Sequence, residues 1–411
     1  MDDSSDFTKF KIMISHKQLF LQNNAQTSTS PNFLEIDHAA GIYLFDKNGK
    51  SHIDLVSGFA VSNIGHRHPK VIEAIKTQLD KYLHLTVYGE FVQTPMVLFA
   101  QKLVAVLPDS LNNVYFVNSG AEATEGALKL AKKYTGRSGI ISYYNSYHGS
   151  THGALSVMGN EYYKQDYRPL LPDVRFINFN EEADLALITE DTACVILETI
   201  QGEAGIRVPT LNYMLALRKR CTEVGALLIL DEIQAAFGRT GTLFAFENYG
   251  IVPDILLLAK ALGGGMPMGA FIANKEVMGV LKENPILGHI TTFGGHPVCC
   301  SAGMASLEVI LEENLVQDVN KKGELFRTLL VHPLIREIRG KGLMLSIQLD
   351  SFEQVEKVSK LCQERGVVID WFLHCETAMR IAPPLIIKEE EIHQVCAVIL
   401  EALELIGALK N

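Results

Sequence analysis

ALLILDE at residues 226–232 and ILLLAK at residues 255–260 are apolar runs that each end in a charged residue. Continuous apolar runs are typical of parallel strands, because helices cover such a sheet on both faces. Similar short runs recur at residues 114–117, 140–141, 174–177, 195–197 and 270–273, with helical stretches between several of them. The sequence therefore predicts an α/β fold whose large domain holds a mostly parallel, seven-stranded sheet covered by helices.

The segments before this sheet carry weaker patterns. Residues 1 to about 40 are polar, which indicates an irregular arm. Asn48 and Gly49 lie between two short apolar runs and predict a β-hairpin, because both residue types tolerate positive φ. Pro69 starts a segment of helical spacing, as is common in the first turn of a helix.

The segments after the sheet predict a second, smaller α+β unit. A long helix is expected from about residue 297 to 311, followed by strands near 342–349 and 367–371 and a closing helix near 389–405. We therefore divide the chain into an N-terminal arm and hairpin at 1–55, which joins the smaller unit, a large α/β domain at 56–296, and a C-terminal α+β part at 297–411.

Composition narrows the class of function. With 37 basic against 47 acidic residues, the net charge is −10 and no basic block is present, so we expect neither nucleic acid nor a membrane as partner. The seven cysteines are odd in number and lack C-x-x-C spacing, which favours a reducing compartment and no metal site. Met1-Asp2-Asp3 is too acidic to begin a secretory signal, so a cytoplasmic enzyme for small molecules is expected.

Charged residues end the two apolar runs quoted above. Lys260 is either a lysine that extends to solvent or a desolvated amine of lowered pKa that forms a Schiff base with a carbonyl cofactor. Asp231 is either a capping carboxylate or the buried partner that keeps the pyridine nitrogen of pyridoxal phosphate (PLP) protonated. Because reactive groups gather where the strands of such sheets end, we expect these residues to share a site.

An anion site is expected where a strand meets a helix near Gly120. Ser119, Gly120 and Ala121 present free backbone amides at the helix start, which suits a phosphate. The glycine fingerprints of dinucleotide sites and of P-loops are absent, which disfavours those two classes. Tyr147, in the run Tyr147-His148-Gly149, either stacks on a flat cofactor ring or packs in the core.

Taken together, seven blocks of sequence resemble the fold-type I, class III PLP aminotransferases, the group of the ornithine, acetylornithine and 4-aminobutyrate aminotransferases. The resemblance runs from Gly41 to Pro384 and covers almost the whole chain. In chain order, the blocks are NSGAEA at 118–123, YHG at 147–149, QGE at 201–203, DEIQAAFGRTG at 231–241, Lys260, TFGG at 292–295 and RIAPPL at 380–385.

The resemblance implies PLP as cofactor and a role for each matching residue. Lys260 would form the Schiff base and later carry the proton, and Asp231 would hold the pyridine nitrogen. Gln234 would lie near the phenolic oxygen of the ring. The implied cofactor-binding residues are Ser119, Gly120, Ala121, Tyr147, His148, Glu198, Asp231, Gln234, Lys260 and Thr292.

The resemblance also implies how substrates and subunits meet. Arg380 would bind the α-carboxylate of an amino acid, because its guanidinium matches a carboxylate with two hydrogen bonds. Glu203 would pair with Arg380 when no α-carboxylate is present. Thr292 resembles the residue that reaches the phosphate from the other subunit, so a homodimer with shared active sites is implied, and further pairing into a tetramer is left open.

Three positions depart from the pattern of this group. Ser150 stands where an arginine usually follows His-Gly and holds the distal carboxylate of the donor. Either another cation replaces that charge, or the donor has no carboxylate at that distance; the candidate cations are Lys164, Arg168 and Arg207. The milder departures are Thr199, where proline is frequent, and His296, where asparagine is usual.

The expected function is a ping-pong transfer of an amino group from an ω-amino acid or amine, ornithine- or acetylornithine-like, to a 2-keto acid such as 2-oxoglutarate. The alternatives are a PLP aminomutase or decarboxylase of the same fold and a diamine or amine:pyruvate transaminase. A catalytically inactive relative would be expected to lack Lys260 or Asp231, and both are present.

Overall fold

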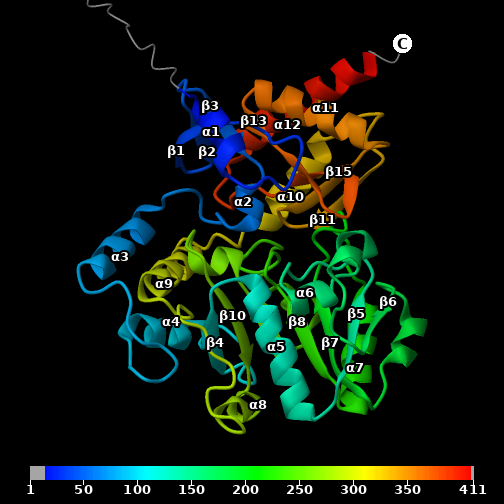
Figure 1. Ribbon diagram of the computed structural model, residues 1–411. Helices are drawn as coiled ribbons and strands as arrows, with labels where there is room; N and C mark the ends of the chain where they lie inside the picture. The colour runs from blue at the N-terminus through cyan, green and yellow to red at the C-terminus, as the bar shows by residue number, and fades with distance from the viewer. Residues whose placement is uncertain (1–13, 409–411) are drawn as a thin grey trace, which may run out of the picture.

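A seven-stranded sheet forms the centre of the larger unit, in the order β4-β10-β9-β8-β7-β5-β6 (Figure 1). All pairings in it are parallel except those of β10, which runs antiparallel to β4 and to β9. The computed structural model describes residues 14–408, so the acidic start at residues 1–3 lies outside the described residues. The strands are β4 (Asn113–Val117), β5 (Gly139–Tyr143), β6 (Val174–Ile177), β7 (Thr192–Glu198), β8 (Leu227–Asp231), β9 (Ile255–Leu258) and β10 (Gly269–Ala273). The predicted fold of the large domain is confirmed.

Helices cover both faces of this sheet. Alternate side chains of each strand enter different apolar layers: Ile229 packs in the layer that contains α5 (Gly120–Thr135), whereas Leu228 packs in the layer that contains α7 (Leu211–Val224) and α9 (Pro297–Glu312). All residues of β7, β8, β9 and β10 are buried. This burial on both faces explains why the strands are apolar without interruption.

The smaller unit joins the two ends of the chain. One four-stranded sheet has the order β1-β2-β3-β13 and the other the order β11-β12-β15-β14. Ile42 and Ile53 from the predicted hairpin pack in one core with residues 319–406, so the N-terminal hairpin belongs to this unit. Its elements are β1 (Ile36–Ala40), β2 (Tyr43–Asp46), β3 (Ser51–Asp54), α10 (Val319–Leu329), β11 (Glu337–Lys341), β12 (Met344–Gln348), α11 (Phe352–Glu364), β13 (Val367–Val368), β14 (Asp370–Phe372), β15 (Cys375–Ile381) and α12 (Glu389–Ala408).

Shorter elements complete the chain. The remaining α-helices are α1 (His16–Asn23), α2 (Ser57–Ala60), α3 (Pro69–Leu79), α4 (Thr94–Val104), α6 (His152–Ser156) and α8 (Lys275–Gly279). The 3-10 helices are η1 (Glu161–Tyr163), η2 (Gln165–Tyr167), η3 (Glu182–Leu187), η4 (Ala245–Tyr249), η5 (Lys260–Gly263) and η6 (Val280–Lys282). No helix within residues 14–408 is both long enough and apolar enough to cross a membrane.

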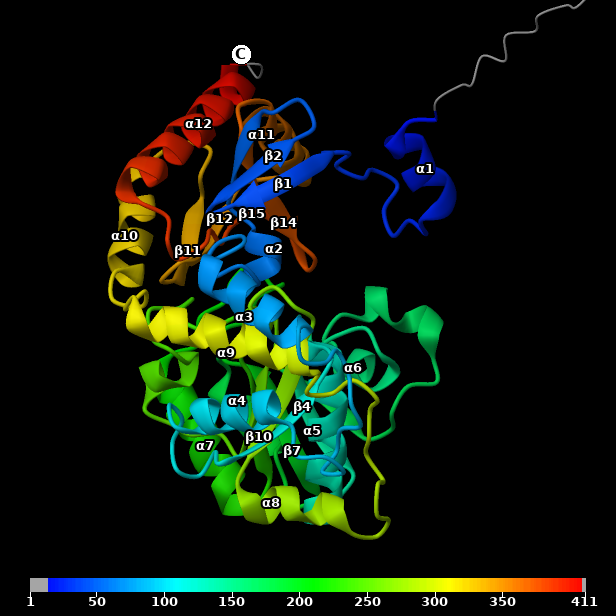
Figure 2. The same cartoon turned by 90° about the vertical axis from the view of Figure 1, so that its left-hand side faces the viewer.

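The expectation of an irregular arm up to residue 40 is wrong for residues 16–23 and 36–40, whereas residues 24–35 are irregular as expected. Residues 16–23 form α1, whose start is fixed by a capping box: Gln18 N donates to Ser15 Oγ at 3.2 Å, and Ser15 N donates to Gln18 Oε1 at 2.8 Å. Residues 36–40 form β1, which pairs with β2. α1 buries no residue and projects from the side of the smaller unit (Figure 2), where its His16 Nδ1 lies 2.6 Å from Lys47 Nζ. Its sequence therefore lacks the apolar periodicity that predicts a helix.

The predicted domain ranges 1–55, 56–296 and 297–411 stay a prediction. α9 falls in the third range, yet its side chains at Cys300, Leu307 and Ile310 pack in the core of the large sheet. In packing terms the smaller unit therefore begins after this helix.

Arg239, in the segment after β8, joins the two units. Its buried guanidinium donates to the carbonyl oxygens of Leu343 at 3.1 Å and Pro383 at 2.5 Å, and to Asn63 Oδ1 at 2.5 Å. Burial lowers the pKa of Arg239 to about 9. Three buried acceptors therefore depend on one side chain.

Replacing Arg239 by Met is expected to lower the free energy of unfolding by roughly 3 kcal/mol, because the acceptors it serves stay buried without donors. The matched control is Arg336→Met, which removes an exposed pair with Asp350 and should hardly change stability. Urea unfolding of the cofactor-free protein, followed by circular dichroism, measures both. Equal stability of the two variants would contradict this role for Arg239.

Candidate active site

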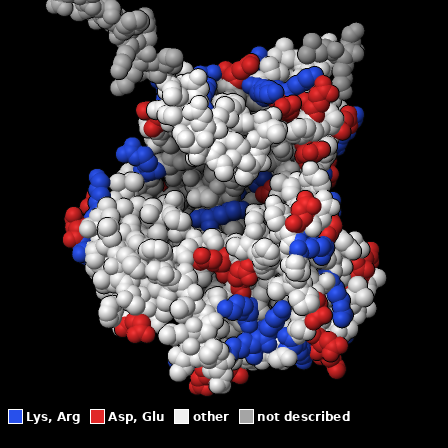
Figure 3. All heavy atoms as spheres, viewed as in Figure 1, with Lys and Arg blue, Asp and Glu red and all other residues white. Residues whose placement is uncertain are grey.

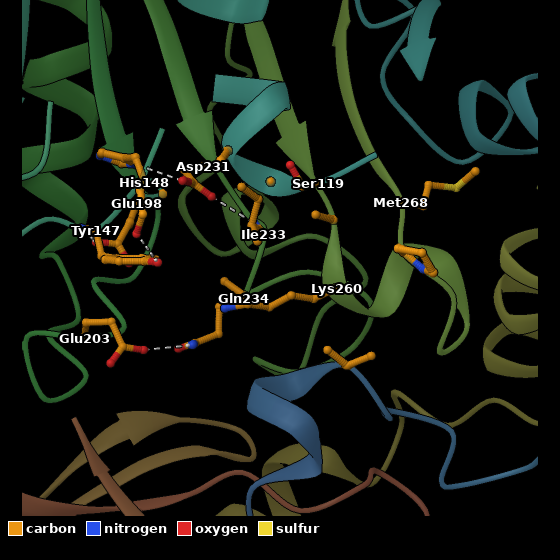
Figure 4. Close-up of a pocket in the computed structure, with 18 of the residues that line it drawn as sticks. Ser119, Tyr147, His148, Glu198, Glu203, Asp231, Ile233, Gln234, Lys260 and Met268 are labelled. Carbon is orange, nitrogen blue, oxygen red and sulfur yellow. Dashed lines mark hydrogen bonds and ion pairs between the residues drawn. The ribbon is translucent and has the colours of Figure 1, made fainter. Parts of the chain in front are cut away.

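The carboxyl ends of β7, β8 and β9 meet at a cavity of about 600 Å³. Residues from the start of α5 and from the loop after β5 complete its wall. Of the residues predicted for the site, those that line the cavity are Ser119, Gly120, Ala121, Tyr147, His148, Glu198, Glu203, Asp231, Gln234 and Lys260. Residues far apart in the sequence are therefore brought together as the strand-end argument predicts (Figure 4).

Lys260 follows β9 and directs its amine into the cavity (Figure 4). Its backbone has a φ of +49°, a conformation that non-glycine residues rarely adopt and that is common at functional sites. Burial lowers the pKa of the Lys260 amine; Arg380 acts in the same direction, and Glu203 opposes it. The alternative that Lys260 extends to bulk solvent does not fit this geometry.

Asp231 ends β8 and forms a buried pair with His148. Asp231 Oδ2 lies 2.7 Å from His148 Nδ1, and Asp231 Oδ1 accepts a hydrogen bond from Ile233 N at 2.9 Å. Both side chains are almost fully buried, which fixes the orientation of the carboxylate. The geometry leaves a negatively charged, oriented acceptor at the cavity wall.

Glu198 ends β7 and ties two loops of the cavity together. Its Oε1 accepts from Tyr147 N at 2.9 Å, and its Oε2 accepts from Gly202 N at 2.8 Å. Burial raises the pKa of Glu198 from its ordinary value of 4.5 to about 7; Asp231 adds to this, whereas His148 and the two amides oppose it. Glu198 thus positions Tyr147 on one side of the cavity and the segment of Glu203 on the other.

Thr199 links the ends of β7 and β8. Its backbone N–H donates to the Asp231 carbonyl oxygen at 3.2 Å, and its hydroxyl donates to buried Glu232 Oε1 at 3.0 Å. Proline has neither donor. Threonine in place of the frequent proline therefore adds two hydrogen bonds at this position.

Glu203 and Arg380 form a bidentate ion pair beside the cavity. Arg380 Nη1 donates to Glu203 Oε1 at 3.0 Å, and Nη2 donates to Oε2 at 2.9 Å. Leu373 N also donates to Glu203 Oε2 at 3.0 Å. Burial alone would raise the pKa of Glu203, but Arg380 and the Leu373 amide lower it to about 2. Glu203 therefore stays ionised and neutralises the charge of Arg380.

Gln234 lies between this pair and Lys260. As drawn in Figure 4, Gln234 Nε2 is 3.4 Å from Glu203 Oε1. Turning the amide by 180° places its oxygen 3.1 Å from both Arg380 Nη1 and Lys260 Nζ. In this orientation the amide oxygen accepts from both side chains, so Gln234 connects Arg380 with the Lys260 amine.

Aromatic rings enclose the Arg380 guanidinium. Phe372 and Phe59 have their ring centres 4.5 and 5.0 Å from it. Phe59 belongs to α2, whose residues 57–60 all have positive φ, and Ser57 anchors this turn by donating to the Ala382 carbonyl oxygen at 2.7 Å. Such a left-handed turn costs about 1–2 kcal/mol for each non-glycine residue, so the surrounding contacts hold it in place.

The start of α5 forms a narrow cradle. Ser119 is the N-cap, and its Oγ accepts from Glu122 N at 3.1 Å. A Cβ atom at Gly120 would lie 2.8 Å from Ile233 Cδ1. A Cβ atom at Gly149, where φ is +126°, would lie 2.6 Å from Ala121 Cβ. Only glycine permits this close approach, which leaves backbone amides open to an anion.

The chain as a whole matches a known family. The family model described as aminotransferase class-III matches residues 24–403. The chain belongs to the class III aminotransferase family. It is 42% identical over 366 residues to the acetylornithine aminotransferase of Methanocaldococcus jannaschii, over 86% of this chain and 89% of that protein.

Solved structures of aminotransferases share the fold. A transaminase from the marine bacterium Virgibacillus has a TM-score of 0.91 and 26% identity, over 97% of this chain and 100% of that chain. The ornithine aminotransferase of Toxoplasma gondii has a TM-score of 0.88 and 30% identity, over 97% of this chain and 96% of that chain, and its structure shows partial occupancy of PLP at the active site. The predicted family, enzyme class and cofactor are confirmed.

The polar groups of the cavity match those that PLP requires. The cavity holds an amine at Lys260, an oriented carboxylate at Asp231 and an anion cradle at the start of α5. These are the groups that a carbonyl, a pyridine nitrogen and a phosphate require. The individual cofactor roles stay predictions.

Some predicted residues lie elsewhere. Arg380 lies behind Glu203, and Thr292 is exposed and does not line the cavity of its own chain. The candidate replacement cations Lys164, Arg168 and Arg207 do not line the cavity either. Ser150 does line it, and its hydroxyl lies 3.4 Å from the Tyr147 hydroxyl.

Sequence reasoning missed the residues that surround Arg380. Asp370 Oδ1 lies 3.2 Å from Arg380 Nε, and Asp370 is the cross-strand partner of Arg380 in the β14–β15 pair. Burial raises the pKa of Asp370 to about 6, against the effect of Arg380. Pairing the two strands from the sequence would have found Asp370, whereas nothing in the sequence places Phe59 near Arg380.

Glu198 should make stability depend on pH. Its pKa is about 4.5 when unfolded and about 7 when folded, so the folded chain binds the extra proton between these values and loses stability as the pH rises through them. The full loss is about 3 kcal/mol, complete above pH 7. Unfolding of cofactor-free Glu198→Gln and wild type at pH 5 and pH 8 should show the variant gaining on wild type by up to this amount. Glu390→Gln, at an exposed position, is the control, and no pH-dependent gain for Glu198→Gln would contradict the assignment.

Proposed function

We propose that this class III aminotransferase moves the amino group of an ω-amino acid or amine, ornithine- or acetylornithine-like, to a 2-keto acid such as 2-oxoglutarate, in two half-reactions. The observation that carries the proposal is the exchangeable Glu203–Arg380 ion pair beside the Lys260 amine. One site can then accept a donor without an α-carboxylate and an acceptor that has one.

Lys260 would move the proton. PLP supplies an electron-withdrawing ring that stabilises the charge left when a proton leaves the donor carbon. Lys260 Nζ, with its lowered pKa, accepts that proton and later returns it. Asp231 would hold the ring nitrogen, with His148 fixing the carboxylate, and the amides of Ser119, Gly120 and Ala121 would hold the phosphate.

Arg380 and Glu203 would select between the two substrates. While Glu203 holds Arg380, the charge of the guanidinium is neutralised, so an amine without an α-carboxylate enters without leaving an unpaired cation. A 2-keto acid brings a carboxylate that matches the same bidentate geometry. It displaces Glu203, which stays ionised and keeps the Leu373 amide as its hydrogen-bond donor.

Replacing Lys260 by Ala is expected to reduce turnover by at least a factor of about 10³, because the proton carrier is lost, while some PLP stays bound. The measurement is transamination from glutamate to pyruvate, with the visible absorbance of the cofactor read in parallel. Lys275→Ala, at a surface position of α8, is the control. Undiminished turnover of Lys260→Ala would refute the assignment, and turnover without a separate keto acid would indicate a mutase or decarboxylase.

We further propose a cytoplasmic homodimer with shared sites. An apolar cavity of about 570 Å³ is lined by Tyr115, Met278 and Leu287, and nearby Val92 and Ile286 are 91% and 76% exposed. Figure 3 shows few charged side chains over α4 and the segment after α8. Such a face favours a second copy as its cover. All seven cysteines are free thiols, which supports a reducing compartment.

Thr292 belongs to the segment that would cross to the partner. Its neighbour Thr291 accepts a hydrogen bond from Asn118 Nδ2 at 2.7 Å, which fastens the segment beside the α5 cradle. Thr292 itself is exposed and thus available to a second chain. In this arrangement each site needs Lys260 from one chain and Thr292 from the other.

Mixing two inactive chains tests this sharing. Lys260→Ala and Thr292→Val should each lower activity, and dissociating and reassociating a mixture should restore activity, because one site of each mixed dimer is then intact. The control is the double variant Lys260→Ala/Thr292→Val mixed with Lys260→Ala, which should regain nothing. If Thr292 serves its own chain, the first mixture also stays inactive.

A further inference from the structure

Apart from Lys260, the charged groups that line the active-site cavity already have partners. Among the described residues 14–408, Lys260 is the one lysine or arginine in the cavity wall. Asp231 forms a pair with His148, Glu198 accepts hydrogen bonds from two backbone amides, and Glu203 forms an ion pair with Arg380. In the part of the wall that the described residues of this chain supply, the far end of a donor therefore meets no cation other than Lys260 and no carboxylate without a partner.

Two of the three candidate cations are paired elsewhere, and the third, Arg207, is exposed and does not line the cavity. Lys164 is 4% exposed; its amine donates to the Met158 carbonyl oxygen at 2.9 Å and lies 3.9 Å from the centre of the Phe176 ring. Arg168 binds Glu161, with Nε at 3.1 Å from Oε1. These contacts hold both positive charges outside the cavity.

The rest of the wall is neutral. The hydroxyls of Tyr147 and Ser150 lie 3.4 Å apart, and Val61, Met266 and Met268 add apolar surface. Hydroxyls both donate and accept hydrogen bonds, so the pair suits a neutral group such as an amide. A carboxylate or an ammonium there would lose hydration without gaining a counter-charge.

We propose that the preferred amine donor has an uncharged, hydrogen-bonding far end, which the Tyr147 and Ser150 hydroxyls recognise. The inference rests on the proposed aminotransferase function and narrows its substrates. It favours amine donors over ornithine-like amino acids, and a keto acid without a distal carboxylate, such as pyruvate, over 2-oxoglutarate. It resolves the two alternatives for Ser150 in favour of a donor without a distal carboxylate.

A matched series of donors tests this. 4-Aminobutanamide, 4-aminobutanoate and 1,4-diaminobutane share one carbon chain and differ in the charge of the far end. With PLP-loaded enzyme, the loss of the cofactor absorbance band gives the rate of the first half-reaction. We expect kcat/KM for the amide to exceed both others by about tenfold or more, the size of one charged interaction. A charged donor that equals or exceeds the amide would overturn the proposal.

Variants at Ser150 test whether the charge at this position determines which donor is preferred. Ser150→Arg places a cation at the cavity wall, and Ser150→Gln adds similar reach without charge. The arginine variant should raise kcat/KM for 4-aminobutanoate about tenfold relative to the amide, and the glutamine variant should not. An unchanged ratio in Ser150→Arg, or an equal rise in Ser150→Gln, would show that charge is not what selects the donor.

Alanine separates the two levels of the proposal, because its α-carboxylate suits Arg380 and it carries no group at the far end. If alanine converts the cofactor but the amide shows no advantage, this inference fails and the aminotransferase function stands. If neither alanine nor any of the three amines converts it, the proposed function fails as well.

Discussion

The burial of β7, β8 and β9 on both faces is the constraint on which the rest of the molecule depends. A strand with helices above and below it has no place for a charged side chain within its length. Charge is therefore confined to the carboxyl ends, where Glu198, Asp231 and Lys260 follow their strands and meet at one cavity. The same constraint that forms the core of the enzyme thus assembles its chemistry, and the helix that starts at Gly120 adds an anion site to the same edge.

The second constraint on the structure is the junction between the two units, which an ion pair bridges. Arg380 is on β15 of the smaller unit and Glu203 follows β7 of the larger one, so their ion pair joins the two units beside the cavity. Arg239 fastens the same junction with neutral carbonyl acceptors that no substrate competes for. In the proposed reaction the Glu203–Arg380 pair exchanges partners, while the contacts of Arg239 continue to hold the two units together.

The sequence predicted those features of the fold and site that depend on a local pattern of residue types. The apolar runs predicted the sheet, and the charged residues after them predicted the cavity, because strand ends of a parallel sheet share an edge. Contacts between distant segments were not predictable in this way. Asp370 and Phe59 reach Arg380 only through a strand pairing and a left-handed turn, and α1 escaped notice because it buries nothing in this chain. Glu203 and Thr292 were assigned by resemblance, since no local rule singles them out.

Gly149 has a consequence for engineering the substrate range. The residues on either side of position 150 make contacts that hold the loop in place. His148 pairs with Asp231, and Gly149 allows the loop to approach Ala121 closely. Thr151 donates a hydrogen bond to Glu125 Oε1 at 2.5 Å. A randomised library across this loop would lose most of its members to misfolding. Saturation at position 150 alone keeps the scaffold intact, so the donor range of this fold can be searched through a single codon.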